Sequence, residues 1–313
     1  MARNSLHGKL VAVVGGSGFI GRHLAQELLK RGARLRLISR NVERASAVKP
    51  LGNLGQVQLL RGDVRKADEL ASLLAGADGV VNLAGTFAGN LDAVMGSGAG
   101  AVARAAQAAG AKAMVHVSAI GADAGGETAY ARAKAAGEAA VLAAFPAATV
   151  LRPSVLFGPD DMFINRFAGL IARFPVMPVF APQAELQPVF VDDVALAIAN
   201  ALADPAAHGG KTFEIAGPQR LTMAQLNRMI AAGAHRSPLF LDLPDSASGL
   251  FVALTGWLPG APISGQQWKL LKAGNAASDN LPGLKELGVS ARPLGLFLDR
   301  WLVRFRKHGR FGN

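Results

Sequence analysis

Apolar residues in the first half of the chain fall into short runs, and longer segments with helical spacing separate these runs. The first run, 9–14, is rich in β-branched residues and ends in glycines, which is typical of a strand buried on both faces of a parallel sheet. The strands expected from such runs span 9–14, 34–38, 57–60, 80–83, 113–117 and 149–152. The helices expected between them span 21–31, 69–75, 98–109 and 130–144. This alternation predicts an α/β fold, a Rossmann-like doubly wound parallel sheet with right-handed crossovers.

The regular alternation ends near residue 153, after which prolines recur at short intervals. We therefore expect a Rossmann domain over 1–155 and a smaller C-terminal lobe that occupies most of 156–313. Two later strands, near 187–191 and 211–215, are expected to return to the central sheet. Thr222 and Gln225 have the spacing of a capping box, which predicts a helix that continues through Ile230.

A last helix is expected over 293–307, with apolar and basic residues on different faces. The basic face carries Arg300, Arg304 and Lys307. The apolar face is expected to carry Leu294, Phe297, Leu298, Trp301, Leu302 and Phe305. Such a helix either packs on its own domain or docks on a partner or an anionic membrane surface.

The composition excludes several classes of protein. With 313 residues, of which 50% are hydrophobic and 18% charged, the chain can bury a large core and is not a disordered or collagen-like protein. The sequence has no cysteine, which excludes disulfides, thiol nucleophiles and Cys-ligated metals, and its six histidines show no metal-ligand spacing, so we expect no metal site. The apolar runs at 10–14 and 250–258 are too short for a signal peptide or a membrane span, so we expect a cytoplasmic protein, or one peripheral to the inner face of a membrane.

The net charge of +11 would suit a polyanionic partner. Much of the excess positive charge lies in 292–313, a segment that contains six basic residues and one acidic residue. The sequence contains no fingerprint of a nucleic-acid-binding module, so we expect no nucleic acid partner.

A glycine-rich loop follows the first expected strand and opens the first expected helix. Its glycines at 15, 18 and 21 allow a tight turn and a close approach of the backbone to a pyrophosphate, which binds the free N–H groups of the helix N-terminus. In a strand–loop–helix unit this spacing predicts a dinucleotide site. The loop residues expected to bind the cofactor are Gly15, Ser17, Gly18, Phe19, Ile20 and Gly21.

The end of the second expected strand bears on the choice of cofactor. NAD-binding sheets place an acidic residue there for the ribose 2′-hydroxyl, but this chain has Ser39 and Arg40. A hydroxyl and a guanidinium suit a 2′-phosphate, so NADP(H) is the preferred cofactor and NAD(H) is the alternative. Contacts to the adenine and to the nicotinamide-side ribose are expected at the ends of the third and fourth strands, from Asp63, Val64, Leu83, Ala84 and Gly85.

Tyr130 is the single tyrosine of the chain, and Lys134 follows it by one helical turn. Ser118 comes just after the fifth expected strand, at the carboxyl edge where doubly wound sheets bind ligands. These residues predict a catalytic site in which Tyr130 is the general acid or base, Lys134 and an oxidised nicotinamide lower its pKa, and Ser118 binds the substrate oxygen. The alternative is that Tyr130 and Lys134 only fix the ribose and pack the helix. We set His116 aside as a partner of Ser118, because neighbouring strand positions point to opposite faces.

Together these motifs resemble those of an extended or atypical short-chain dehydrogenase/reductase. The resemblance rests on Gly15-x-x-Gly18-x-x-Gly21, Asn82-Leu-Ala-Gly85, Ser118, Tyr130-x-x-x-Lys134 and Arg152-Pro-Ser154. The runs 116–121, 130–138, 151–159, 187–193 and 279–288 are similar to the branch that contains the NADPH-binding accessory subunit of respiratory complex I and its bacterial epimerase/dehydratase-like relatives. By this resemblance Pro153 and Val155 would flank the nicotinamide, Lys134 would anchor the ribose, and the lobe after Phe157 would close over the substrate.

The resemblance implies two functions, and the sequence leaves both open. The first is an NAD(P)(H)-dependent oxidoreductase, or an epimerase/dehydratase-like enzyme, that acts on an unidentified carbonyl or alcohol substrate. An apolar stretch over 162–180 suits a lipophilic substrate, although core packing accounts for it better. The second is a non-catalytic NADPH-binding subunit that docks on a membrane-associated respiratory assembly through its basic C-terminal helix. The sequence indicates no oligomeric state.

Overall fold

The computed structural model describes residues 6–255 and 265–309 of the chain. The chain divides into two compact units, each built from several segments. The first unit comprises Met1–Pro153, Val191–Ile215 and Ser278–Ser290. The second comprises Ser154–Phe190, Ala216–Ala277 and Ala291–Asn313.

The first unit is built on a seven-stranded sheet in the order β11-β6-β5-β4-β1-β2-β3, in which each neighbouring pair is parallel. Its strands are β1 (Leu10–Val14), β2 (Arg34–Ser39), β3 (Val57–Arg61), β4 (Gly79–Asn82), β5 (Ala113–Val117), β6 (Thr149–Pro153) and β11 (Thr212–Ile215). The direction of winding reverses between β1 and β4, and at such a switch point doubly wound sheets bind their ligands. The predicted doubly wound parallel sheet is confirmed, and the segment near 211–215 returns to its edge beside β6.

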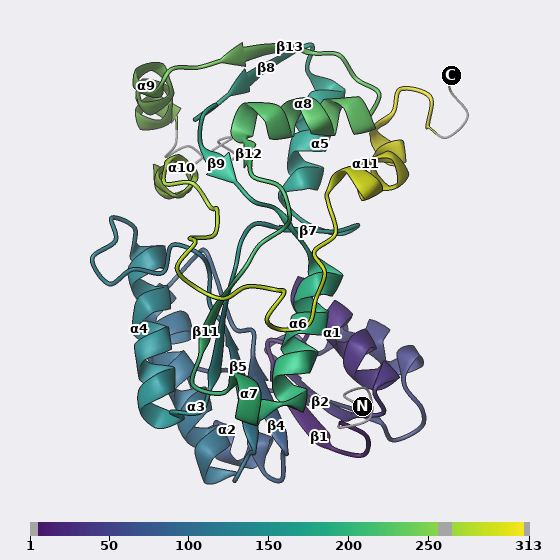
Figure 1. Cartoon of the computed structure of the whole chain (residues 1–313), viewed down its shortest axis with the longest axis vertical. Coiled ribbons are helices and arrows are strands. Elements are labelled where there is room, and N and C mark those ends of the chain that lie inside the picture. The colour runs from purple at the N-terminus through teal and green to yellow at the C-terminus, as the bar shows by residue number, and fades with distance from the viewer. Residues whose placement is uncertain (1–5, 256–264, 310–313) are drawn as a thin grey trace. The chain divides into compact units, whose positions relative to one another are not determined.

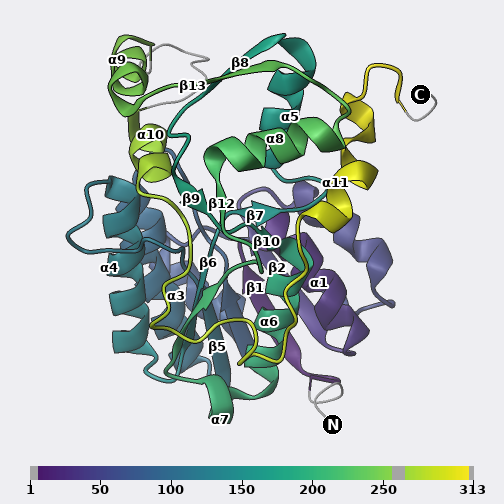
Figure 2. The same ribbon diagram turned by 45° about the horizontal axis from the view of Figure 1, so that its top comes forward.

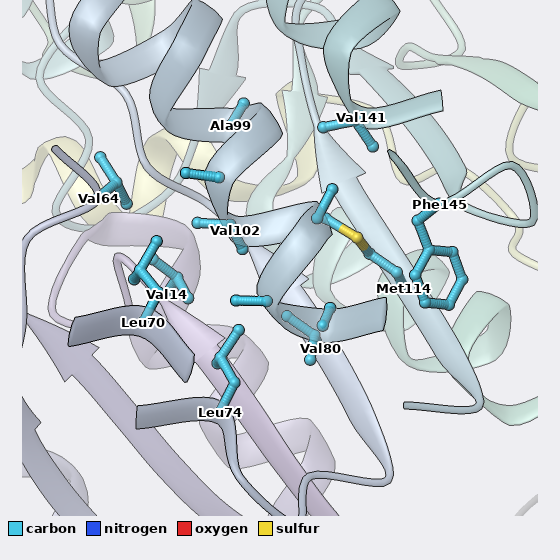
Figure 3. Packing of buried hydrophobic residues seen from close by; sticks show 14 of the residues in the cluster. Val14, Val64, Leu70, Leu74, Val80, Ala99, Val102, Met114, Val141 and Phe145 are labelled. Atoms are coloured by element: carbon cyan, nitrogen blue, oxygen red, sulfur yellow. The ribbon is translucent and has the colours of Figure 1, made fainter. Parts of the chain in front are cut away.

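Helices cover both faces of this sheet (Figure 1). One face is covered by α1 (Phe19–Lys30) and α6 (Val191–Ala203), which pack on each other. The other face is covered by α2 (Ala67–Leu74), α3 (Ser97–Ala108) and α4 (Ala129–Ala144). Shorter helical segments are η2 (Glu43–Leu51), the π turn η3 (Asp92–Gly96) and α7 (Pro205–His208). Under α2, α3 and α4 the apolar side chains of the strands and helices form one core, which includes Leu70, Val80, Val102, Met114 and Val141 (Figure 3).

Small residues let α4 approach α3 and η3 closely. A Cβ atom on Gly100 would lie 2.9 Å from the Cβ of Ala140, and a Cβ on Gly137 would collide with the carbonyl oxygen of Met95. Since backbone atoms at such a contact cannot move aside, the glycine and alanine positions fix where α4 lies on the sheet. Tyr130 and Lys134 are carried by this helix.

The expectation that a strand over 187–191 returns to the central sheet is wrong. Only β10 (Val189–Phe190) is extended there, and it pairs with β7 (Leu156–Phe157) in the second unit instead of joining the central sheet (Figure 2). Pro188 has no N–H group for a strand ladder, and the chain enters α6 at Val191. The extended segment is therefore too short to add to the sheet.

The second unit contains short strands and helices. The helices are α5 (Ile164–Arg173), α8 (Met223–Gly233), α9 (Asp245–Thr255), α10 (Gly265–Lys272), α11 (Gly295–Trp301) and the 3-10 segment η4 (Leu302–Phe305). The strands β8 (Val176–Val179) and β13 (Leu239–Asp242) pair in parallel, and β9 (Glu185–Leu186) and β12 (Leu221–Thr222) pair antiparallel. The capping box of Thr222 and Gln225 is confirmed at the start of α8.

The continuous helix expected over 293–307 is wrong, because α11 ends at Trp301 and η4 follows it. The guanidinium of Arg306 donates to the carbonyl oxygen of Asp299 at 3.0 Å, so a side chain caps a carbonyl that a continuing helix would have used. Leu298 and Leu302 are buried, and a Cβ on Gly233 of α8 would lie 2.8 Å from the Cβ of Leu298. The apolar side of this segment therefore packs within its own unit.

No helix among the described residues is long and apolar enough to cross a membrane. The apolar run at 250–258 continues past Thr255 into residues that the structure does not describe. Arg310 of the basic C-terminal end also lies outside the described residues.

Candidate functional site

The glycine-rich loop has the geometry of a dinucleotide-binding turn. Gly15 has a φ of +80°, and its N–H donates to the carbonyl oxygen of Ile38 at 2.8 Å, which ties the loop to the end of β2. A Cβ on Gly15 would lie 2.9 Å from the carbonyl carbon of Leu83, and a Cβ on Gly21 would collide with the carbonyl oxygen of Gly16. Only glycine fits these two positions, as the close backbone approach requires.

The N-terminus of α1 fits an anion. Gly18 is its N-cap residue, and no side chain of the described residues caps it. The N–H groups of the first helical turn, on Phe19, Ile20 and Gly21, have no acceptor within an ideal helix and carry the positive end of its dipole. Ser17, Phe19 and Ile20 are partly exposed beside them. These groups suit the pyrophosphate of a dinucleotide.

The ends of β2 and β3 bring cations and a carboxylate together. Ser39 is buried and donates its hydroxyl to the carbonyl oxygen of Asn41, whereas Arg40 is exposed. The guanidinium of Arg65 donates to the carboxylate of Asp63 and is the largest cause that lowers the pKa of Asp63 to about 2, with a smaller contribution from Arg40. Arg40 therefore lies close enough to Asp63 to act on its charge, while the carboxylate expected to contact adenine is held by Arg65. Val64, the next residue, is buried in the core.

The segment after β4 lies between the glycine loop and Lys134. Asn82 is fully buried, and its side-chain oxygen accepts a hydrogen bond of 3.1 Å from the N–H of Ala84. A Cβ on Gly85 would lie 3.9 Å from the Nζ atom of Lys134. The residues expected to line the ribose, 83–85, therefore connect the phosphate end of the site to α4.

Tyr130 and Lys134 lie close together at the carboxyl edge of the sheet, beside the backbone that leads into Ser118. The Nζ of Lys134 donates to the carbonyl oxygen of Val117 at 3.2 Å, directly before Ser118, and lies 5.9 Å from the ring centroid of Tyr130. Thr128 places the helix start, because its hydroxyl caps α4 by accepting from the N–H of Ala131. The N–H groups of Ser118 and Ile120 donate to the carbonyl oxygens of Leu151 and Pro153 on β6, which fixes this segment to the sheet.

Burial shifts the pKa values of the two titrating groups. Desolvation raises the pKa of Tyr130 to about 12, and it lowers the pKa of Lys134 to about 8 against an opposing contribution from Glu138. The ring of Phe87 is stacked on that of Tyr130, with centroids 4.7 Å apart and planes 10° from parallel. In the protein without nucleotide, loss of water around the phenol therefore determines the direction of this shift. The lower pKa expected from Lys134 together with an oxidised nicotinamide stays a prediction.

His116 and Ser118 are buried polar residues at the same edge. Within the described part of the chain, neither the Nε2 atom of His116 nor the Oγ atom of Ser118 has a hydrogen-bond partner. The Nδ1 atom of His116 lies 3.2 Å from the side-chain nitrogen of Asn82, and burial and the charge of Lys134 lower its pKa to about 3. Our reason for setting His116 aside was wrong, since positions two apart along a strand share a face. A neutral His116 accepts a hydrogen bond from the side-chain nitrogen of Asn82 and so orients that amide.

The sequence prediction missed an ion pair one turn beyond Lys134. Glu138 accepts two hydrogen bonds from the guanidinium of Arg152, at 2.9 and 2.7 Å, and both residues are largely buried. The spacing of four residues between Lys134 and Glu138 on one helix was the available signal. Among the other expected cofactor residues, Pro153 ends β6 in the first unit, whereas Val155 belongs to the second unit and its contact with the nicotinamide stays a prediction.

The chain is similar in sequence to several known proteins. A family model described as NAD(P)H-binding matches residues 15–165. The chain is 32% identical to the mitochondrial NADH dehydrogenase (ubiquinone) 1 alpha subcomplex subunit 9 of Mus musculus, over 98% of this chain and 83% of that protein. It is 35% identical to a ceramide reductase of Caulobacter vibrioides over 59% of this chain and 58% of that protein.

Among solved structures, the NADPH-dependent quinone oxidoreductase of Escherichia coli complexed with NADPH shares the fold. The TM-score is 0.72 at 21% identity, and the match covers 92% of this chain and 98% of that chain. The resemblance expected from the motifs is confirmed. By its identity and coverage, the chain belongs to the family of the alpha subcomplex subunit 9, an NAD(P)H-binding branch of the short-chain dehydrogenase/reductase proteins.

Proposed function

We propose that this protein is an NADP(H)-preferring oxidoreductase that transfers hydride between the nicotinamide and the carbonyl or alcohol carbon of a small substrate. The observation that carries the proposal is the position of the Lys134 Nζ atom. This atom donates a hydrogen bond to the carbonyl oxygen of Val117, directly before Ser118, and lies 5.9 Å from the Tyr130 ring centroid. It is also close to Gly85. A general acid, a cation and a buried hydroxyl thus meet next to the segment that suits the cofactor ribose.

The chain's own residues suit the reductive direction. A bound reduced nicotinamide supplies the hydride. Tyr130, with its pKa raised to about 12, holds its proton at neutral pH and donates it to the carbonyl oxygen as the carbon accepts the hydride. Ser118 has a buried hydroxyl without a partner among the described residues, and it donates a hydrogen bond to the same oxygen. Lys134 is mostly charged at neutral pH, stabilises the phenolate left behind and binds the ribose. The phenolate regains its proton from solvent.

Preference for NADP(H) is supported by the charges at the end of β2. Arg40 is exposed there, and the guanidinium of Arg65, close by, donates to the carboxylate of Asp63. No acidic residue stands at 39 or 40 to repel a 2′-phosphate.

The names of two relatives, a ceramide reductase and a 2-alkyl-3-oxoalkanoate reductase, support reduction as the class of reaction.

The direct test is NADPH oxidation, followed by its absorbance, with a panel of ketones and aldehydes. We expect turnover by the wild type, loss of at least about a hundredfold in kcat with Tyr130→Phe, and retained nucleotide affinity in that variant. Arg173→Ala, which removes an exposed side chain of the second unit, is the matched control and is expected to retain full activity. Nucleotide binding without oxidation by any carbonyl would refute the oxidoreductase.

A second function is favoured by the names of several relatives, which are subunits of NADH dehydrogenase. On this proposal the chain binds NADPH without turnover and docks on a membrane-associated respiratory assembly through its basic C-terminal segment. Deleting residues 293–313 would expose the core of the second unit, because Leu298 and Leu302 are buried there. Charge reversal of the exposed Arg300 and Lys307 tests docking instead, and we expect it to release the protein from membranes of its own cells while leaving NADPH binding intact. Unchanged membrane association in this double variant would refute docking through that segment.

A further inference from the structure

An exposed phenylalanine covers the ring of the proposed general acid. Phe87 keeps 73% of its surface exposed, although one face of its ring lies flat on Tyr130. Single exposed apolar side chains are common on protein surfaces, and what sets Phe87 apart is that its ring stacks on Tyr130. Because one ring face is occupied by Tyr130, the other face is the one available to a ligand.

A small hydrogen-bonded turn fixes the backbone that carries Phe87. The hydroxyl of Thr86 donates to the carbonyl oxygen of Ala88 and accepts from its N–H, which closes a small turn around Phe87. Asn90 then accepts from the N–H of Ala93, at the start of the π turn η3 that packs against α4. The loop that carries Phe87 and the helix that carries Tyr130 are thus joined through η3.

The residues that directly follow β4 and β5 carry no charged side chain, and the first charged residues after them are Asp92 and Asp123. After β4 the residues are Leu-Ala-Gly-Thr-Phe-Ala-Gly-Asn-Leu over 83–91, and after β5 they are Ser-Ala-Ile-Gly-Ala over 118–122. A substrate with a carboxylate or phosphate beside its carbonyl would find Lys134 as the cation that faces Tyr130, and Lys134 already donates to Val117. An apolar group beside the carbonyl would instead bury surface against Phe87.

We propose that Phe87 is a specificity-determining residue that binds the apolar substituent of an uncharged ketone substrate and covers one face of Tyr130. This deepens the proposed oxidoreductase, since it names the class of carbonyl compound that the same site takes. The ketone carbon lies near the Tyr130 hydroxyl, and its alkyl or aryl substituent lies on the free face of the Phe87 ring.

Coverage of Tyr130 can be measured without any turnover. Because Tyr130 is the single tyrosine of the chain, tyrosinate absorbance in a stopped-flow pH jump reports this residue alone when it is read in the first milliseconds, before alkaline unfolding. The charged group that faces the ring is Lys134 from α4, and it is the same in every variant compared. We expect Phe87→Ala to lower the midpoint by about one pH unit or more, because it exposes the phenol face to water, and Phe87→Leu to lower it by less. Tyr130→Phe supplies the baseline, and equal midpoints for wild type and Phe87→Ala would overturn the coverage.

Ligand choice is measured by equilibrium binding of ketones in the presence of NADP⁺, a pair that cannot react. The probes are methyl heptyl ketone and pyruvate, which differ in the apolar chain and the charge beside the carbonyl. We expect wild type to bind methyl heptyl ketone more tightly than pyruvate, and Phe87→Ala to weaken the former by about tenfold with little effect on the latter. Phe174→Ala, which removes another exposed phenyl ring, is the matched control and should bind as wild type does.

Failure of this inference and failure of the proposed function are distinguishable. Tight binding of pyruvate, or equal binding of methyl heptyl ketone to wild type and Phe87→Ala, would overturn the role of Phe87 whether or not NADPH is oxidised. If methyl heptyl ketone binds through Phe87 but no ketone oxidises NADPH, the inference stands as a binding site and the oxidoreductase fails.

Discussion

The ion pair between Glu138 and Arg152 links the stability of the first unit to the proposed site. The Glu138 side chain is 9% exposed and the Arg152 side chain 25%, and two hydrogen bonds join them. Replacing Glu138 by Gln removes the charge with almost no change in volume. Loss of one partner from a fully buried pair costs about 3–5 kcal/mol. Gln keeps one acceptor oxygen, Arg152 is partly solvated, and Glu214 also acts on its charge, so we expect Glu138→Gln to lower the free energy of unfolding by about 2 kcal/mol.

Urea unfolding followed by far-ultraviolet circular dichroism measures this change. The control is Glu69→Gln, the same chemical change in the pair of Lys66 and Glu69, whose side chains are 63% and 50% exposed. An exposed pair of this kind contributes about 0–1 kcal/mol, so the control should be close to wild type. If Glu138→Gln were no less stable than Glu69→Gln, the burial argument for this pair would be refuted.

The same substitution has a second, independent readout. Glu138 opposes the desolvation that lowers the pKa of Lys134 to about 8. Without the Glu138 carboxylate, the pKa of Lys134 falls further. Lys134 then loses its proton, and with it the charge proposed to bind the cofactor ribose, at a lower pH. We expect the pH at which NADPH affinity declines to be lower in Glu138→Gln than in wild type. An unchanged midpoint would mean that Lys134 does not contribute its charge to nucleotide binding.

Three further predictions concern the cofactor, the packing of α4 and the titration of Lys134. Arg40→Asp is expected to weaken NADPH by at least about tenfold and NADH much less, and equal effects in a binding titration would refute the 2′-phosphate assignment. Gly137→Ala is expected to destabilise the protein by about 1–3 kcal/mol in urea unfolding, because the new Cβ collides with the Met95 carbonyl, whereas Gly249→Ala in α9, where a Cβ meets nothing within 4 Å, should be neutral or stabilising. The pKa of Lys134 falls from 10.5 to about 8 on folding, so the unfolded chain binds more protons between these values and stability rises with pH in that window. Lys134→Met should remove this rise, which amounts to roughly 3 kcal/mol, and an identical pH dependence in both proteins would contradict the burial of a charged Lys134.

The sequence predicted the sheet well because its strands are buried on both faces and stand out as apolar runs. The later part of the chain was harder, since short elements there depend on what they pair with. The segment near 187–191 has a strand-like composition, but Pro188 and the start of α6 leave only Val189–Phe190 to pair with β7. The C-terminal helix had the right spacing for one continuous amphipathic element, and it ends early because the Arg306 side chain binds the Asp299 carbonyl. No local pattern contains such a contact.

The candidate site shows the same division between position and environment. Motif spacing predicted that Ser118, Tyr130 and Lys134 lie together, because residues at the ends of parallel strands and one helical turn apart must meet at the same edge. It did not predict the environment of the phenol, which depends on the stacked ring of Phe87, 43 positions away along the chain, and on the loss of water around it.

The raised pKa of Tyr130 bears on the direction of the proposed reaction. A phenol with a pKa of about 12 is a proton donor at neutral pH, and the reduction of a carbonyl needs a donor. Oxidation of an alcohol needs the phenolate, which the protein alone disfavours, and an additional positive charge on an oxidised nicotinamide would have to stabilise it. Lys134 can supply only part of that stabilisation, since burial lowers its own pKa to about 8 and so weakens its charge as the pH rises. In the protein without nucleotide, the surroundings of Tyr130 therefore favour the protonated phenol that the proposed reduction needs. This preference follows from how strongly the site excludes water and not from which residues the motif contains.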